Sequence, residues 1–129
     1  MMPKTDSRPV YLNLFQFHFP PNALLSISHR IAGIALILTL PIWLILFNFM
    51  VLEPQANHQA WLQTTLGKSF VLLFWLALYF HWLAGARHLF IEFCINSRFK
   101  QIARTNRMAW VTFFIWLLGA VFIGWEVWS

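Results

Sequence analysis

The segment from Ser69 to Glu92, SFVLLFWLALYFHWLAGARHLFIE, decides how this chain folds. It carries no charge as far as Ala86, and an apolar run of this length indicates a helix that crosses a membrane. Residues spaced at i, i+4, i+7 and i+11 lie on one stripe of a helix, and that stripe carries His81, Gly85, His88 and Glu92. We therefore expect a membrane-spanning helix with one polar face.

His81 lies in the apolar part of this segment, where an imidazole without a hydrogen-bond partner costs about 1–3 kcal/mol. Two kinds of partner suit it. One is a polar group on a neighbouring helix, and the other is a haem iron, to which a neutral ring nitrogen binds. Gly85, one turn further on, leaves room for a flat ligand, although glycine also permits close packing of two helices. The spacing leaves both interpretations open.

The composition excludes an ordinary soluble domain. Of the 129 residues, 60% are hydrophobic and only 10% are charged, and the length predicts a single integral membrane domain, 1–129. The net charge of +5 comes from basic residues that flank apolar runs, which favours membrane orientation over nucleic-acid binding. Cys94 is the one cysteine and there is no C-x-x-C-H motif, so any haem is b-type.

Apolar runs predict an all-α fold of three transmembrane helices. After a tail of about 1–22, we expect spans at about 23–52, 67–93 and 108–128. The charge-free run from Ile31 to Leu52 reaches about 33 Å, enough to cross a bilayer core of roughly 30 Å, and Pro41 should kink it. The first connection, Glu53 to about Leu66, is expected to be a solvated loop that includes His58, and the second, 96–107, is basic.

The basic residues also predict the orientation of the chain. Most of them precede or begin the first span or lie in the second connection, whereas the first connection has only Lys68, offset by Glu53. The positive-inside rule then places the N-terminus in the cytoplasm and the C-terminus in the periplasm.

Basic side chains near His81 suit the acidic edge of a haem. Arg87 lies about 9 Å nearer the cytoplasm than His81 along the helix. Arginine pairs well with carboxylates, and the residues at the depth expected for the haem propionates are His29, Arg30, Arg87 and His88. Snorkelling to lipid headgroups is the alternative for Arg30 and Arg87, and for Glu92 we expect an internal salt bridge.

A six-coordinate haem needs a second axial ligand at the depth of His81. His29 is expected nearer the interface, and no other histidine of this chain fits better. We therefore expect a partner subunit to supply that ligand.

Ser26 and Arg30 form a second candidate site near the start of the first span. A hydroxyl and a guanidinium can hydrogen-bond a quinone carbonyl and stabilise the charge that develops on reduction. The alternative is that Ser26 only bonds to nearby backbone groups.

These motifs together resemble a known family. Arg8-Pro9, the run SISHRIAG from Ser26 to Gly33, and His81-x-x-x-Gly85-Ala86-Arg87-His88-Leu89-x-x-Glu92 resemble the cytochrome b membrane-anchor subunit of succinate dehydrogenase, complex II. Two positions depart from the family pattern: Ala32 stands where Ser or Thr is usual, and Glu92 where Asp is usual.

The resemblance implies a bacterial inner-membrane subunit that binds haem b and ubiquinone and anchors a flavoprotein and an iron–sulfur subunit. It also implies a second, small membrane subunit, so that the three helices form half of a heterodimeric haem-binding bundle. It implies His81 as the axial ligand of the haem iron, Ser26 and Arg30 at the quinone, and His29, Arg30 and His88 around the propionates. The chain would perform no succinate chemistry itself. It would help electrons pass from succinate, through flavin and iron–sulfur clusters, to ubiquinone.

A haem-free structural anchor of a fumarate reductase-type complex is the alternative, in which His81 bonds only to another helix. A small transporter subunit is disfavoured, because the polar groups are confined to one half of the spans.

Overall fold

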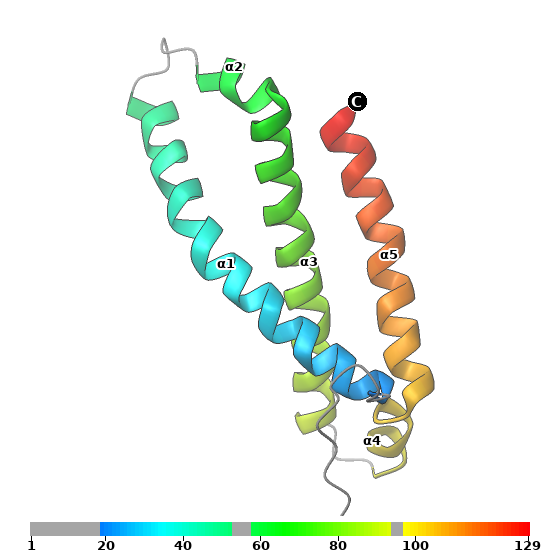
Figure 1. Cartoon of the computed structure of the whole chain (residues 1–129). Helices are drawn as coiled ribbons and strands as arrows, with labels where there is room; N and C mark the ends of the chain where they lie inside the picture. Colours follow the sequence, from blue (N-terminus) through cyan, green and yellow to red (C-terminus); the bar gives the residue numbers. More distant parts are fainter. Residues whose placement is uncertain (1–18, 53–57, 94–96) are drawn as a thin grey trace, which may run out of the picture.

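The computed structural model describes residues 19–52, 58–93 and 97–129, which form five α-helices (Figure 1). These are α1 (Pro21–Leu52), α2 (His58–Gln63), α3 (Thr65–Phe93), α4 (Ser97–Ala103) and α5 (Asn106–Trp128). Three of them, α1, α3 and α5, are long and apolar enough to cross a membrane, which confirms the predicted all-α class. Each begins two residues before the start that the sequence suggested.

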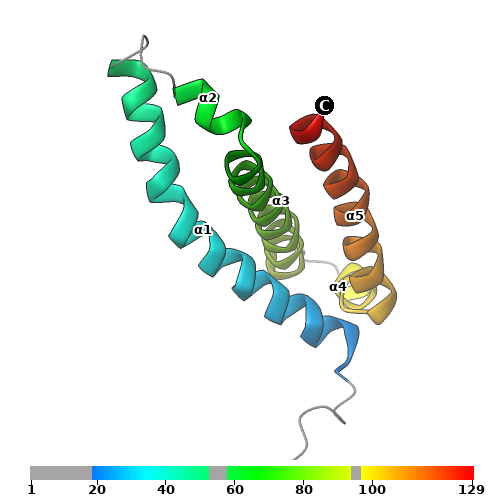
Figure 2. The same cartoon turned by 45° about the horizontal axis from the view of Figure 1, so that its top comes forward.

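The middle helix of the bundle is α3, which contacts both α1 and α5 (Figures 1 and 2). Helix α1 crosses α3 obliquely, so that its first turn reaches the start of α5. We call this end of the bundle the α4 end, where α1 and α5 begin and α3 finishes. The opposite end, where α1 and α5 finish and α2 leads into α3, is the α2 end.

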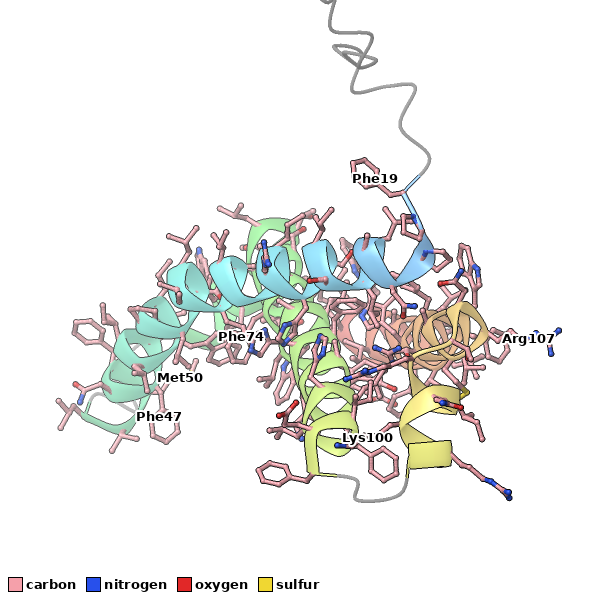
Figure 3. The ribbon with its side chains drawn as sticks, turned by 90° about the horizontal axis from the view of Figure 1, so that it is seen from below. Phe19, Phe47, Met50, Phe74, Lys100 and Arg107 are labelled. Atoms are coloured by element: carbon pink, nitrogen blue, oxygen red, sulfur yellow. The ribbon has the colours of Figure 1, made fainter. Side chains whose placement is uncertain are left out.

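Helix α1 is bent in its middle, as the view from the α4 end shows (Figure 3). Pro41 lies inside this helix. Proline has no N–H to give to the preceding turn, and its ring crowds the carbonyl there, so the bend has the cause that the sequence predicted. Beyond the bend α1 leans away from α3 toward the α2 end (Figure 2).

The packed core is small and lies in the half of the bundle near the α4 end. Phe80 of α3 is 5% exposed and meets the rings of Phe113 and Trp116 of α5, with centroids 5.8 and 5.5 Å apart. The other buried members are mostly alanines, namely Leu25, Ala32, Ala84 and Ala109. Small side chains let backbones approach closely, which matters in a bilayer because lipid tails are as apolar as the helices themselves.

Outside this core the three long helices expose large apolar side chains. Ile37 is 73% exposed and Val121 is 67% exposed. The buried hydroxyls of Thr39 and Thr112 donate to carbonyls of their own helices, at 2.7 and 2.9 Å, so they need no water. Such surfaces suit lipid or other membrane-embedded helices.

The first connection is not a solvated loop throughout, because α2 occupies its second half and begins at His58. Trp61 of α2 is half-buried and its ring lies 6.1 Å from that of Phe70 in α3. Gly67 permits this packing, since a Cβ there would collide with the Trp61 carbonyl. Burial of an aromatic ring therefore overrides the polar character of the segment. The basic second connection contains the short helix α4. Residues 53–57 and 94–96 lie outside the described part.

Candidate functional site

Two histidines and two glycines form a reciprocal contact between α1 and α3. The ring of His81 lies over Gly33, where an added Cβ would come within 3.1 Å of Cε1. The ring of His29 lies over Gly85, where an added Cβ would be 3.5 Å from Nε2. Because the helices are antiparallel and each glycine follows its histidine by four residues, each glycine makes room for the other helix's imidazole. The space that the sequence suggested for a flat ligand at Gly85 is thus filled by His29.

The predicted stripe on α3 faces α1 and meets His29. The imidazoles of His29 and His81 are stacked, with centroids 4.1 Å apart and planes inclined by 16°. His88 lies on the other side of His29, 5.6 Å away and tilted by 55°. The expected separation in depth between His29 and His81 is therefore wrong. Oblique crossing of α1 over α3 brings their levels to within about one helical turn, and the side chains span that distance.

The contact of His81 with a backbone carbonyl indicates which of its ring nitrogens carries a proton. Nδ1 lies 3.3 Å from the backbone carbonyl oxygen of His29. A carbonyl oxygen can only accept, so Nδ1 carries the proton, and the Nε2 of a neutral ring keeps its lone pair. This is the arrangement in which a histidine is oriented by a backbone carbonyl and offers its other nitrogen to a metal. The Nε2 of His29, by contrast, is buried and has no hydrogen-bond partner.

Arg87 joins the helices at the α4 end. Its Nη2 donates to Asn22 Oδ1 of α1 at 2.9 Å and to the Ala103 carbonyl at the end of α4 at 2.6 Å. The Asn22 amide in turn donates to the Arg104 carbonyl at 2.8 Å and to Asn106 Oδ1 of α5 at 3.0 Å. We call these five residues the polar knot. Arg87 Nε remains buried without a partner.

A cleft of about 590 Å³ opens beside the polar knot. Its polar lining comes from Asn22, Arg87, His88, Glu92 and Arg104. The internal salt bridge expected for Glu92 does not form among the described residues. Glu92 lies exposed at the rim of this cleft, while Arg87 Nη2 donates to Asn22 and to the Ala103 carbonyl.

The two predicted quinone-site residues lie on the first turns of α1, apart from the stacked rings. Ser26 is half-buried and Arg30 is exposed. Ser26 follows Asn22 by one turn, so the polar knot fixes the part of α1 from which both side chains project.

The sequence reasoning missed Asn22 and the contact between Gly33 and His81. The sequence placed Asn22 only at the border between the tail and the first span. Its bond to Arg87, 65 positions away, had no sequence signal.

Known proteins resemble the chain over nearly its full length. The family model described as succinate dehydrogenase/fumarate reductase transmembrane subunit matches residues 4–123. The succinate dehydrogenase cytochrome b556 subunit of Coxiella burnetii is 32% identical over 129 aligned positions, which cover 94% of this chain and 97% of that protein. The chain thus belongs to the succinate dehydrogenase/fumarate reductase transmembrane subunit family.

Proposed function

We propose that this chain is the haem b- and quinone-binding anchor subunit of a succinate dehydrogenase in a bacterial inner membrane. The observation that carries the proposal is the hydrogen bond from His81 Nδ1 to the His29 carbonyl. It orients an intramembrane imidazole and leaves its Nε2 as a ligand for iron. The b556 in the name of the Coxiella relative is consistent with a b-type haem.

The residues of the site fit such a group in a second respect. A haem brings two carboxylates, and buried polar atoms without partners are the groups that a carboxylate would satisfy. His29 Nε2 and Arg87 Nε are two such atoms. With His81 on the iron, the propionates would therefore be held by His29, Arg30, Arg87 and His88. When bound, the haem supplies a one-electron redox centre.

A second axial ligand is assigned to a partner membrane subunit. His29 cannot take this role, because rings stacked face to face at 4.1 Å cannot point nitrogen atoms at one iron from opposite sides. The sequence analysis excluded His29 because of its expected depth, whereas here the stacking of the two rings excludes it. In both cases a partner subunit is needed for the second ligand. The exposed apolar sides of the long helices offer area for the partner's helices.

Replacement of His81 tests the haem assignment. In the purified complex, His81→Ala should abolish or shift the α-band of the dithionite-reduced spectrum. The matched control is His58→Ala at the start of α2, which should keep the band. An unchanged spectrum in His81→Ala, with all subunits present, would refute His81 as the ligand.

Ser26 and Arg30 are assigned to ubiquinone. Their hydroxyl and guanidinium can donate to a quinone carbonyl oxygen as it gains charge, and this stabilisation is lost if a donor is removed. Arg30→Ala should lower quinone reductase activity about 10- to 100-fold, as expected for the loss of one hydrogen bond that involves a charged group. Succinate oxidation measured with an artificial dye should stay near normal.

The control for Arg30→Ala is Arg107→Ala, because Arg107 also lies at the α4 end but points away from the bundle (Figure 3). This variant should keep both activities. An equal loss of both activities in Arg30→Ala would indicate failed assembly, and no loss would remove Arg30 from the quinone site.

The α4 end is assigned to the cytoplasmic side, where the iron–sulfur and flavoprotein subunits would dock. Lys100, Arg104 and Arg107 lie at this end, whereas Lys68 is at the other, as expected from the positive-inside rule. Electrons from succinate would then reach ubiquinone beside Ser26 and Arg30, and the C-terminus would lie in the periplasm.

One observation favours a haem-free anchor of a fumarate reductase-type complex instead. The stack of His29 and His81, with the bond to the His29 carbonyl, partners His81 without a metal. A purified wild-type complex with no α-band after reduction would support this alternative.

A further inference from the structure

A second cleft, of about 340 Å³, lies at the α2 end, between α3 and the last turns of α5. It is at the opposite end of the bundle from the stacked histidines. Its polar side chains are Gln63, Lys68 and Glu126, and its apolar walls include Val71, Trp75 and Phe122. The proposed haem and quinone sites use none of these residues.

Both walls of this cleft change from charged to apolar in the same direction. On α3, Lys68 near the helix start is followed on the same face by Val71 and Trp75. On α5, Glu126 near the helix end is preceded by Phe122 one turn earlier. The charges therefore lie at the depth of lipid headgroups, and the apolar side chains lie deeper, where acyl chains run.

Lys68 and Glu126 line the same cleft without forming an ion pair in the described part of the chain. The Lys68 ammonium lies over the Trp128 ring instead, 5.9 Å from its centroid. The cleft thus offers one positive and one negative group that are not paired with each other, beside apolar walls.

We propose that this cleft binds a phospholipid with a primary ammonium headgroup, of the phosphatidylethanolamine type. Lys68 would pair with the phosphate, and the Glu126 carboxylate would accept from the ammonium. An anionic phospholipid would satisfy Lys68 but place no cation against Glu126. A choline headgroup has no N–H to donate to the carboxylate. The ethanolamine headgroup matches both charges, and its chains match Val71, Trp75 and Phe122.

The test uses the intact, delipidated complex, titrated with phosphatidylethanolamine, phosphatidylcholine and phosphatidylglycerol and followed by native mass spectrometry. The wild type should bind phosphatidylethanolamine about tenfold more tightly than either other lipid, the ratio expected for one charge-assisted hydrogen bond. Glu126→Gln should remove this preference while leaving phosphatidylglycerol binding intact. Lys68→Gln should weaken all three.

The matched control is Glu92→Gln, which removes the same charge at the α4 end and should leave the preference unchanged. Equal binding of the three lipids by the wild type would overturn the proposal, as would a preference that survives in Glu126→Gln. Loss of the preference in Glu92→Gln would also overturn it, because the lipid would then lie at the other end. Comparison of the three lipids on the wild type needs no variant to fold. The result does not depend on whether the complex holds haem.

Discussion

The two ends of this bundle are held together by different forces. At the α4 end, the polar knot links the starts of α1 and α5 to α3 and α4 through hydrogen bonds of 2.6–3.0 Å. Toward the α2 end, contacts between α1 and α3 are mainly aromatic, such as Trp43 with Phe74 at 5.4 Å. The Trp43 indole N–H is buried there without a partner. The helices converge at the first end and diverge at the second (Figure 2).

This difference indicates what fixes helix geometry in a membrane. Apolar contacts gain little over contacts with lipid, so they specify position weakly. A polar group away from water has few places to bond, so each hydrogen bond fixes a relative position of two helices. The end that carries the proposed electron-transfer residues is the end fixed in this way.

The largest expected effect comes from breaking the polar knot. Arg87→Ala removes the donor to Asn22 and to the Ala103 carbonyl and should cost about 2–3 kcal/mol of stability. The temperature at which the heated complex loses its elution peak in size-exclusion chromatography should fall by several degrees. Arg104→Ala is the control, because only the backbone carbonyl of Arg104 bonds to Asn22. Equal losses in the two variants would contradict the role of the knot.

A smaller effect is expected where α5 approaches α3, beyond the knot. A Cβ at Gly119 would collide with the ring of Tyr79, whose hydroxyl donates to the Ile115 carbonyl at 3.2 Å. Gly119→Ala should therefore cost about 1–2 kcal/mol by overpacking, measured by the same thermal assay. Nothing lies within 4 Å of a Cβ at Gly124, so Gly124→Ala should be neutral or slightly stabilising. If both variants behave alike, α3 and α5 do not pack as described.

The smallest change in stability is expected from alanine substitutions at the two glycines of the histidine contact. Gly33→Ala places a methyl group 3.1 Å from His81 Cε1, so the ring must shift by a few tenths of an ångström and its bond to the His29 carbonyl weakens. We expect a cost of about 1 kcal/mol. Gly85→Ala meets His29 Nε2 at an ordinary 3.5 Å and should change stability less. The thermal assay measures the stability of both variants. A larger loss in Gly85→Ala would contradict the closer contact that we describe at Gly33.

Much of the fold could be predicted because it depends on local composition. Length and hydropathy set the three long helices, and Pro41 set the bend in α1. The two short helices could not be predicted, since α2 depends on Trp61 packing against Phe70, a contact between separate segments. The polar composition of the first connection predicted a loop, but burial of the Trp61 ring favours a helix there.

The candidate site, like the fold, could be predicted from the sequence only in part. Helical spacing alone placed His81, Gly85 and His88 on one stripe of α3, and in the structure this stripe faces α1. The spacing could not show that His29 fills the space at Gly85, because the relative position of two helices is not encoded in either of them. The roles of Ser26 and Arg30 stay predictions.

The sequence by itself determined that three segments are long and apolar enough to cross a membrane, that most of their ionisable groups gather in one half, and that the chain resembles a succinate dehydrogenase anchor. These follow from the cost of placing charges in hydrocarbon and from helical periodicity, which act within each segment. The tertiary structure decided that His29 stacks on His81 and that Arg87 bonds to Asn22 rather than to Glu92. Such pairings depend on the crossing of α1 over α3, which is fixed by hydrogen bonds and close contacts between residues far apart in the chain.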